Sequence, residues 1–371
     1  MTMMKKIKIC HVIGDFVNGG VESVIYNYFS HMDLDKFEVH IIGHGIKVKA
    51  CADRFSDMGF VIHNITPKSV NFTRSLAEMK AIFKENKFDI IHSHLTEWAC
   101  VPMFLGWLCG VKVRINHSHM AEKPKGLKNK VYYGVRLQLG KLFATDYFAC
   151  GEDAGRYLFG DREVDSGKVT ILPNAIDFNK YCFNLSVRNK MRSALGLRDI
   201  TMVIGHVGRF FEQKNHQFLV EIFKDYHEKN PNSVLLLFGD GELREKVEEK
   251  VNVLGLRDAV RFMGVQQNMS DWYQVMDIFV LPSLYEGLPV VGVEAQAVGL
   301  PCLFSDQITK EIGISSETKF LPINKGTKPW VESIGFDRKR DSAPCVDMER
   351  YDISKRAHNL QEFYIRKSRI N

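Results

Sequence analysis

The 371-residue chain has no CxxC pair, no repeat of fixed period and no apolar run long enough to cross a membrane. Its eight cysteines are scattered, and several fall inside apolar runs, which is typical of reduced, buried thiols and argues against disulfides. The longest apolar run, residues 98–111, is shorter than the roughly 20 residues of a membrane-spanning helix. The first residues lack the pattern of a secretory signal. These absences predict a cytoplasmic protein.

Charge of one sign is also scarce, because the net charge is only +6. So small an excess does not make nucleic acid the expected partner. The basic residues do concentrate in residues 123–145, where six of them alternate with apolar residues and no acidic residue occurs. Such a stretch fits a helix lying on anionic lipid, which would place the protein at the inner face of the plasma membrane. It fits equally well a solvated helix face.

Short β-rich runs alternate with helical periods, which predicts an α/β fold with parallel sheets covered by helices on both faces. Helices with apolar stripes are expected at residues 21–32, 73–85 and 218–226. The expected strands are 6–13, 37–42, 60–65, 88–94, 111–117, 147–150 and 169–172 in the first half, and 201–207, 233–238, 260–263, 277–281 and 301–305 in the second.

The pattern restarts after residues 174–199, a polar and weakly patterned stretch where we place the linker. We therefore predict two doubly wound, Rossmann-like domains, residues 1–175 and 176–345. Residues 346–371 should hold a carboxyl-terminal helix with Asp352 as its N-cap. Its return to the first domain is implied only by the family resemblance given below. Such sheets bind ligands at the carboxyl ends of their strands, so we expect the site in a cleft between the domains.

The run PSLYEGLPVVGVEA, residues 282–295, contains the strongest signal for a binding site. Gly287 suits a tight turn, and Pro289 suits the first position of a helix, where its missing N–H is not needed. The helix start then favours an anion such as a phosphate. Glu286 and Glu294 beside a phosphate suggest carboxylates that accept hydrogen bonds from sugar and ribose hydroxyls, hence a nucleotide sugar. Alternatively, both glutamates only stabilise the helix start.

A second group follows the strand at residues 201–207. Arg209, after Gly208, and Lys214 are two cations at a strand end that can neutralise a diphosphate in the bound and departing states. A solvated loop would have the same composition. The run Gly-Asp-Gly at residues 239–241 indicates a turn with a close approach.

Together these motifs resemble the donor-binding half of the retaining glycosyltransferases of family 4, which share the GT-B fold. The resemblance covers nearly the whole chain, and within the family it is greatest to enzymes of bacterial exopolysaccharide and capsule assembly. One departure is Ala175, where the family often has glycine. The resemblance also includes GGVE at 19–22, HSH at 117–119, PNAID at 173–177, DIFVLPS at 277–283 and the tail around residues 351–353.

This resemblance implies roles for individual residues. Arg209 and Lys214 would hold the donor diphosphate, Glu294 the ribose and Glu286 the donor sugar. His117, ahead of His119, would lie near that sugar, so the catalytic set is Glu286, His117, Arg209 and Lys214. The remaining donor-binding positions are Gly19, Gly20, Gly208, Gly241, Met263, Val265, Gly287, Leu288, Val290 and Val291.

Four histidines, His92, His94, His117 and His119, end two of the predicted strands. Imidazole is the commonest metal ligand, so they admit the interpretation of a metal hydrolase. However, these histidines are accompanied neither by a carboxylate at clear ligand spacing nor by a DxD pair that would hold a metal against a diphosphate. We therefore expect no metal and no other cofactor, and each histidine can equally be a hydrogen-bonded structural residue.

The sequence thus predicts a retaining, metal-independent glycosyltransferase of the hexosyl type. It would move a sugar from a nucleotide sugar, expected to be a UDP-sugar, to a lipid-linked or polysaccharide acceptor in cell-surface polysaccharide synthesis. Its oxocarbenium-like transition state needs a neutralised leaving group more than a strong base. A nucleotide-sugar epimerase of the same fold is the alternative, although it needs acid–base residues. A non-catalytic membrane-associated binding protein is supported only by the basic stretch.

Overall fold

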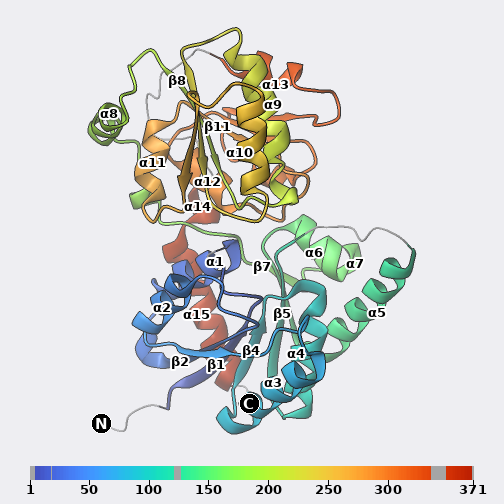
Figure 1. Ribbon diagram of the computed structural model, residues 1–371. Coiled ribbons are helices and arrows are strands. Elements are labelled where there is room, and N and C mark those ends of the chain that lie inside the picture. Colours follow the sequence, from blue (N-terminus) through green and yellow to red (C-terminus); the bar gives the residue numbers. More distant parts are fainter. Residues whose placement is uncertain (1–4, 18, 121–126, 336–347, 370–371) are drawn as a thin grey trace. The chain divides into compact units, whose positions relative to one another are not determined.

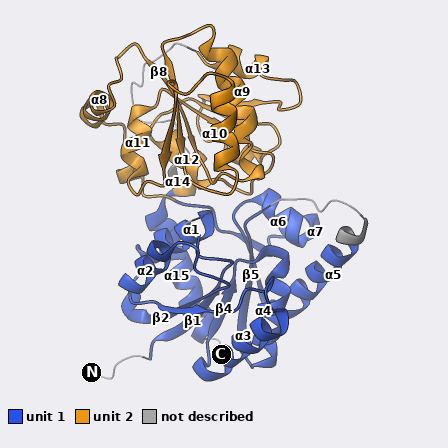
Figure 2. Ribbon diagram, in the orientation of Figure 1, with its two compact units in different colours: residues 1–175, 352–371 blue, residues 176–351 orange. Residues whose placement is uncertain are grey.

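The computed structural model describes residues 5–17, 19–120, 127–335 and 348–369. The chain divides into two compact units, each built on one parallel sheet (Figures 1 and 2). The first unit comprises residues 1–175 and 352–371, and the second comprises residues 176–351. Both are Rossmann-like α/β domains, as predicted.

The first unit contains a seven-stranded sheet in the order β3-β2-β1-β4-β5-β6-β7. Its strands are β1 Ile7–Val12, β2 Phe37–Gly43, β3 Val61–Asn64, β4 Ile90–Ser93, β5 Val113–Ser118, β6 Asp146–Ala149 and β7 Val169–Ile171. Its helices are α1 Gly20–Phe29, α2 Lys49–Asp57, α3 Phe72–Asn86, α4 Cys100–Leu108, α5 Leu127–Phe143, α6 Glu152–Phe159, α7 Asp161–Asp165 and α15 Ile353–Arg369, with 3-10 turns η1 Leu34–Lys36 and η2 Thr96–Ala99.

Alternate residues of β1 and β4 face opposite sides of this sheet, as the period of two requires. Cys10 and Ile91 belong to the apolar core that includes side chains of α3 and α4. Their neighbours His11 and His92 face the other side, where His11 meets Phe29 of α1 and His92 meets Tyr364 of α15. The strand order reverses between β1 and β4, which is where sheets of this kind bind ligands.

The second unit contains a six-stranded sheet in the order β10-β9-β8-β11-β12-β13. Its strands are β8 Met202–Val207, β9 Ser233–Phe238, β10 Val260–Gly264, β11 Ile278–Leu281, β12 Cys302–Ser305 and β13 Thr318–Leu321. Its helices are α8 Leu185–Ala194, α9 His216–His227, α10 Arg244–Val253, α11 Met269–Val275, α12 Val290–Ala297, α13 Lys328–Ser333 and α14 Met348–Tyr351, with 3-10 turns η3 Phe178–Lys180, η4 Glu212–Lys214 and η5 Lys310–Ile312.

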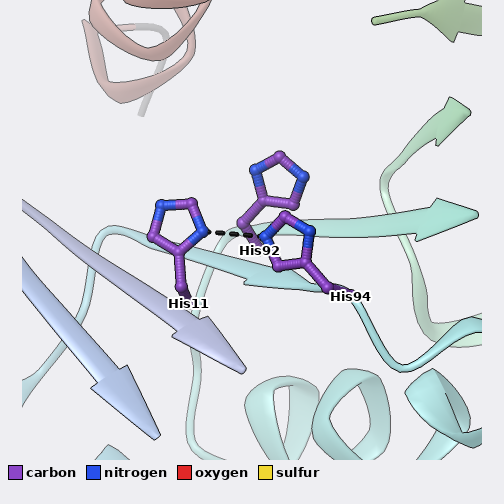
Figure 3. Close-up of side chains that lie close together, drawn as sticks. All are labelled: His11, His92 and His94. Carbon is purple, nitrogen blue, oxygen red and sulfur yellow. Dashed lines mark hydrogen bonds between the residues drawn. The ribbon is translucent and has the colours of Figure 1, made fainter. Parts of the chain in front are cut away.

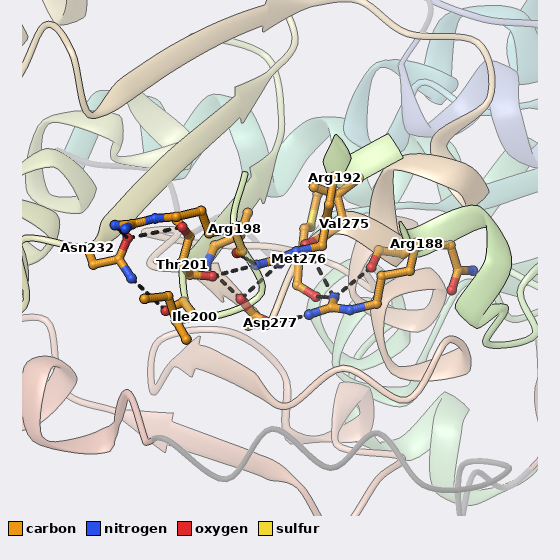
Figure 4. A network of polar contacts seen from close by, with 11 residues as sticks. Arg188, Arg192, Arg198, Ile200, Thr201, Asn232, Val275, Met276 and Asp277 are labelled. Atoms are coloured by element: carbon orange, nitrogen blue, oxygen red, sulfur yellow. Dashed lines mark hydrogen bonds and ion pairs between the residues drawn. The ribbon is translucent and has the colours of Figure 1, made fainter. Parts of the chain in front are cut away.

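Most of the predicted linker, residues 174–199, is instead part of the second unit. Helix α8 lies inside it, and Arg188 and Arg192 of this helix bind the buried Asp277 carboxylate at 2.5 and 3.2 Å (Figure 4). Asp277 also accepts a hydrogen bond from the Val203 amide at 2.7 Å. The boundary between the units, at residues 175 and 176, lies inside the predicted stretch, but the rest of the stretch belongs to the second unit because its charged side chains are paired there.

The carboxyl-terminal helix α15 returns to the first unit and packs beside α1 (Figure 1). Asp352 is its N-cap, as predicted, because its carboxylate accepts a hydrogen bond from the Ser354 amide at 2.9 Å. The predicted boundary between residues 345 and 346 lies outside the described residues. Tyr351 still belongs to the second unit, so the returning segment begins at Asp352.

Two further expectations from the sequence were that the cysteines form no disulfides and that no helix spans a membrane. The seven described cysteines are thiols outside any disulfide, and five of them are buried, whereas Cys345 lies outside the described residues. Over the ranges that the structure describes, no helix combines the length and the apolar character needed to span a bilayer.

Candidate functional site

The run at residues 282–295 connects β11 to helix α12, as predicted. The helix begins at Val290, and Pro289 precedes it as the N-cap with an extended ψ of 113°. Pro289 therefore lies one position earlier than the first helical position that we predicted. The Gly292 amide donates to the Pro289 carbonyl at 3.0 Å, whereas the helix offers no acceptor to the Val290 and Val291 amides, which coincide with the positive end of its dipole. This end of α12 is thus suited to an anion.

Glu286 lies directly before that helix and is buried, with 8% exposure. The Lys214 ammonium donates to one of its carboxylate oxygens at 2.5 Å, and the Gln213 amide donates to the other at 3.1 Å. Gln213 also donates to the Tyr285 carbonyl and accepts from the Leu284 amide, at 2.9 and 2.8 Å. The loops after β8 and β11 are therefore joined, and the structure brings Lys214 and Glu286 together.

Arg209 and Lys214 differ in their surroundings, although both follow β8. Arg209 is exposed, and its guanidinium lies over the Phe211 ring at 4.5 Å. The stem of Lys214 covers Gly208, because a Cβ built on Gly208 would lie 3.0 Å from Lys214 Cδ. Glycine at position 208 therefore leaves room for the lysine that reaches Glu286.

The Gly-Asp-Gly turn at residues 239–241 makes the predicted close approach. The group that it approaches is the backbone of the loop after β8. Gly239 has a φ of 127°, and a Cβ there would lie 2.1 Å from the Gly208 carbonyl oxygen. A Cβ on Gly241 would meet the Phe210 amide nitrogen at 2.8 Å. Only glycine lets the loops after β8 and β9 pack this closely.

Glu294, one turn inside α12, is held by two tyrosine hydroxyls. Tyr181 and Tyr273 donate to its two oxygens at 2.7 and 2.9 Å. Burial raises the pKa of the Glu294 carboxyl, and the two hydroxyls lower it. A carboxylate has about four lone-pair sites, so two remain for further hydrogen-bond donors. The sequence did not indicate these tyrosines, because no motif surrounds them.

The remaining donor-binding positions of the second unit lie around the same loops. Met263 is half-buried and Val265 is exposed, at the carboxyl end of β10. The Gly264 carbonyl accepts from the Gly239 amide at 2.8 Å, which joins the end of β10 to the Gly-Asp-Gly turn. Buried positions are Gly287, Leu288 and Val290, whereas Gly241 and Val291 are half-buried.

The predicted glycines of the first unit lie at the start of α1, where Gly19 is the N-cap and Gly20 the first helical residue. Glu22 accepts a hydrogen bond from the Val17 amide at 2.8 Å, and a Cβ on Gly19 would lie 3.2 Å from its other oxygen. A Cβ on Gly20 would meet nothing within 4 Å. Gly19 is thus crowded by its own loop, whereas Gly20 is exposed.

Histidines gather at the carboxyl ends of β1, β4 and β5. Figure 3 shows three of them, His11, His92 and His94. The structure brings together all four that the sequence indicated. It adds His11, which was missed because a single histidine inside a strand pattern carries no motif. His92 is central to one hydrogen-bonded row, in which Nδ1 lies 2.7 Å from the Tyr364 hydroxyl and Nε2 lies 3.0 Å from His117 Nδ1.

A second row joins His11, His94 and His119. His94 Nε2 lies 2.9 Å from His11 Nδ1, and His94 Nδ1 lies 2.7 Å from His119 Nε2. Burial lowers the pKa of all five imidazoles, to about 3 for His11 and His119, so the rings are neutral at physiological pH.

Two sets of three ring nitrogens lie within 4.8 Å of one another, a spacing that a transition metal also uses. The sets are His11 with His92 and His94, and His94 with His117 and His119. In the structure the short nitrogen–nitrogen contacts occupy several of these atoms. The described arrangement is therefore a network of hydrogen-bonded neutral imidazoles.

Family models match both units. The model described as Glycosyltransferase Family 4 matches residues 18–180, and the one described as Glycosyl transferases group 1 matches residues 201–334. The chain belongs to glycosyltransferase family 4, and its two parallel-sheet units are those of the GT-B fold.

Among its relatives is EpsF of Bacillus subtilis, named as a glycosyltransferase, which is 33% identical over 335 residues, 88% of this chain and 86% of EpsF. The UDP-Gal:α-D-GlcNAc-diphosphoundecaprenol α-1,3-galactosyltransferase of Escherichia coli is 27% identical over 311 residues, 81% of this chain and 80% of that enzyme. The capsular polysaccharide biosynthesis glycosyltransferase CapH of Staphylococcus aureus is 22% identical over 371 residues, 98% of this chain and 99% of CapH.

A solved structure of Anabaena HepE, in complex with UDP and glucose, superposes with a TM-score of 0.79 at 16% identity. The match covers 97% of this chain and all of HepE, and it shows that the fold is shared. The names of the relatives agree with the exopolysaccharide and capsule branch that the sequence resembles. Because these relatives are glycosyltransferases, the epimerase alternative is not favoured.

Proposed function

We propose that this glycosyltransferase moves a sugar from a UDP-sugar to a lipid-linked saccharide during the assembly of a cell-surface polysaccharide. The observation that carries the proposal is the pair formed by half-buried Lys214 and buried Glu286 beside the start of α12. It puts a cation for phosphate and a carboxylate for sugar hydroxyls next to a helix amino terminus. The names of the Escherichia coli galactosyltransferase and of the HepE complex support the acceptor and the donor.

The diphosphate would lie against the first amides of α12, with Lys214 and Arg209 as its cations. An ammonium group has three donors, so Lys214 can hold Glu286 and a phosphate oxygen at once. Glu286, fixed by Lys214 and Gln213, keeps lone pairs for hydroxyls of the donor sugar. Glu294 would accept the ribose hydroxyls beside its two tyrosines.

Catalysis would then come from neutralising the leaving diphosphate, without a metal. We further propose that the anomeric configuration is retained and that the leaving phosphate takes the proton of the acceptor hydroxyl. His117 would contact the donor sugar. Its Nε2 is buried and has no hydrogen-bond partner among the described residues, which supports this role.

We propose that the enzyme works in the cytoplasm, with a peripheral contact to the inner leaflet. Residues 123–126 of the predicted contact lie outside the described residues. In the remainder, an exposed apolar stripe runs along α5 at positions 131, 135, 139 and 142. Exposed Phe104 and Trp107 of α4 extend it, with an edge-on and a tilted contact to the Phe143 ring at centroid distances of 5.1 and 5.3 Å. Residues 100–145 hold eight basic residues and one acidic residue, which fits anionic lipid.

Product analysis tests this function. Purified protein is incubated with a panel of UDP-sugars and a diphosphoundecaprenol-linked saccharide, with and without a metal chelator. We expect one sugar to be transferred with its configuration retained, at the same rate in both conditions. Glu286→Gln should lose transfer by about 100-fold or more, whereas Glu221→Gln, which removes a carboxylate paired with Lys250 in the same unit, should keep it.

Three outcomes would contradict the proposal. Inversion of the configuration would exclude retention, and loss of activity with the chelator would exclude metal independence. Release of an altered free UDP-sugar without any acceptor would favour the epimerase.

A further inference from the structure

Within the described residues, His117 has a hydrogen-bond partner at one of its two ring nitrogens. It lies at the carboxyl end of β5, is fully buried, and its Nδ1 lies 3.0 Å from His92 Nε2. Its Nε2 has no hydrogen-bond partner among the described residues. A neutral imidazole carries its proton on one nitrogen only. Whether Nε2 can donate a hydrogen bond to a ligand therefore depends on what His92 offers to Nδ1.

His92 connects His117 to the carboxyl-terminal helix. Its Nδ1 lies 2.7 Å from the hydroxyl of Tyr364 on α15, a residue 272 positions further along the chain. Tyr364 is itself fully buried, with its ring against Phe29 and Phe37 at 6.4 and 6.1 Å. Both the hydroxyl and the His92 ring are thus fixed in place by packing.

The number of available protons decides which groups donate and which accept in the row Tyr364, His92 and His117. If His92 donated from Nδ1 to the Tyr364 oxygen, the hydroxyl proton would have no acceptor among the described residues, and a buried unpaired donor is costly. If Tyr364 donates instead, its proton is used and His92 Nδ1 is the acceptor. His92 then carries its own proton on Nε2 and donates to His117 Nδ1. His117 must in turn carry its proton on Nε2. This direction leaves one polar group without a partner among the described residues, the His117 Nε2–H, whereas the reverse direction leaves two, the Tyr364 hydroxyl proton and His117 Nε2.

We propose that Tyr364 is a positioning residue, which acts through His92 to keep His117 as an Nε2–H donor toward the donor sugar. The proposal extends the proposed function, because it rests on His117 as the histidine near that sugar. The second row, His11 with His94 and His119, shows the contrast. Its short contacts join imidazoles only, so no hydroxyl imposes a direction on it.

Nitrogen-15 spectra of histidine-labelled protein test the tautomers directly, without any substrate. In the wild type we expect His92 and His117 to be protonated at Nε2 and unprotonated at Nδ1. Tyr364→Phe should shift both pairs of signals toward a mixture of tautomers. Tyr28→Phe is the matched control, since Tyr28 is equally buried in the same unit and its hydroxyl donates to the Pro173 carbonyl at 2.6 Å. It should leave both histidines unchanged.

A second variant guards against misfolding of Tyr364→Phe. His92→Phe keeps a ring but removes both nitrogens. It should therefore also shift His117 toward a mixture of tautomers, as Tyr364→Phe does. Protonation of wild-type His117 at Nδ1 would overturn the proposal. So would an unchanged His117 signal in both Tyr364→Phe and His92→Phe.

Steady-state kinetics test whether Tyr364 affects catalysis. We expect Tyr364→Phe to lower kcat by about tenfold, the equivalent of one hydrogen bond, with the KM for the donor within about twofold of wild type. Tyr28→Phe should stay within about twofold of wild type in both constants. Equal kcat values for the two variants would overturn the role in catalysis. An inactive wild type with the expected tautomers would instead contradict the proposed function alone.

Discussion

Glu286 and Glu294 belong to one short run of sequence but have different surroundings. Glu286 is paired with the Lys214 ammonium, whereas Glu294 receives only neutral hydroxyls. Glu286 thus has a charged partner, whereas burial raises the pKa of the Glu294 carboxyl and its two hydroxyl partners lower it. The two glutamates are therefore suited to different parts of one ligand.

A variant of Tyr273 tests whether its hydroxyl stabilises the charged form of Glu294. The folded-state pKa of Glu294 is raised, so the folded protein binds that proton more tightly than the unfolded chain. Stability from this group is present at low pH and is lost as the pH rises through the raised pKa. Tyr273→Phe removes a hydroxyl that lowers this pKa. We expect its loss of unfolding free energy to be about 1–2 kcal/mol larger at pH 7 than at pH 5.

Denaturant unfolding at the two pH values measures this loss, and Glu294→Gln is the reference background. In that background Tyr273→Phe should lose the same free energy at both pH values, because the amide does not titrate. A loss independent of pH in the Glu294 protein would show that the hydroxyl does not stabilise the charged carboxylate.

The sequence indicated the charged residues of the candidate site but not the tyrosines that contact Glu294 and His92. Glu286, Glu294 and Lys214 stand in motifs whose spacing follows from strand, turn and helix. Tyr181 lies 113 positions from Glu294, and only the folded chain brings them together. The same holds for Tyr364 and His92.

At the scale of elements, helices and strands with strong apolar patterns lie within a few residues of their predicted bounds. Strand β13, Thr318–Leu321, was missed because it is short, lies at the edge of the sheet and shows no apolar run. Helix α8 was missed because its charged side chains, including Arg188 and Arg192, bind inward and mimic a solvated stretch.

Helix α5 leads to a prediction about membranes. Val135 lies in its exposed apolar stripe, with 55% exposure. Val135→Glu should weaken binding to phosphatidylglycerol vesicles by about tenfold or more, because it removes an apolar contact and adds a charge that anionic lipid repels. Vesicle co-sedimentation at low and high salt measures this.

The matched control is Val253→Glu, since Val253 is an exposed valine of α10 in the second unit, with 79% exposure. It should bind vesicles as the wild type does. Equal binding by the two variants, or equal binding of the wild type to uncharged phosphatidylcholine vesicles, would exclude α5 as the lipid contact.

At the scale of the whole molecule, the two-unit organisation could be predicted because the strand–helix pattern restarts once. The return of the last helix to the first unit rests on contacts between distant segments. One is the hydrogen bond from the Asp33 amide to the Gln361 side chain, at 2.9 Å. Composition alone contains no sign of such a contact, and only the family resemblance suggested it.

The central claim is that a nucleoside diphosphate binds where Lys214 and Glu286 meet the start of α12. Thermal unfolding of the full chain with and without UDP tests it most directly. At about 100 times its dissociation constant, UDP should stabilise the wild type by about 2.7 kcal/mol. Lys214→Ala should lose this stabilisation, whereas Lys250→Ala, which removes a lysine paired with Glu221 in the same unit, should keep it. Full stabilisation of Lys214→Ala by UDP would contradict the account.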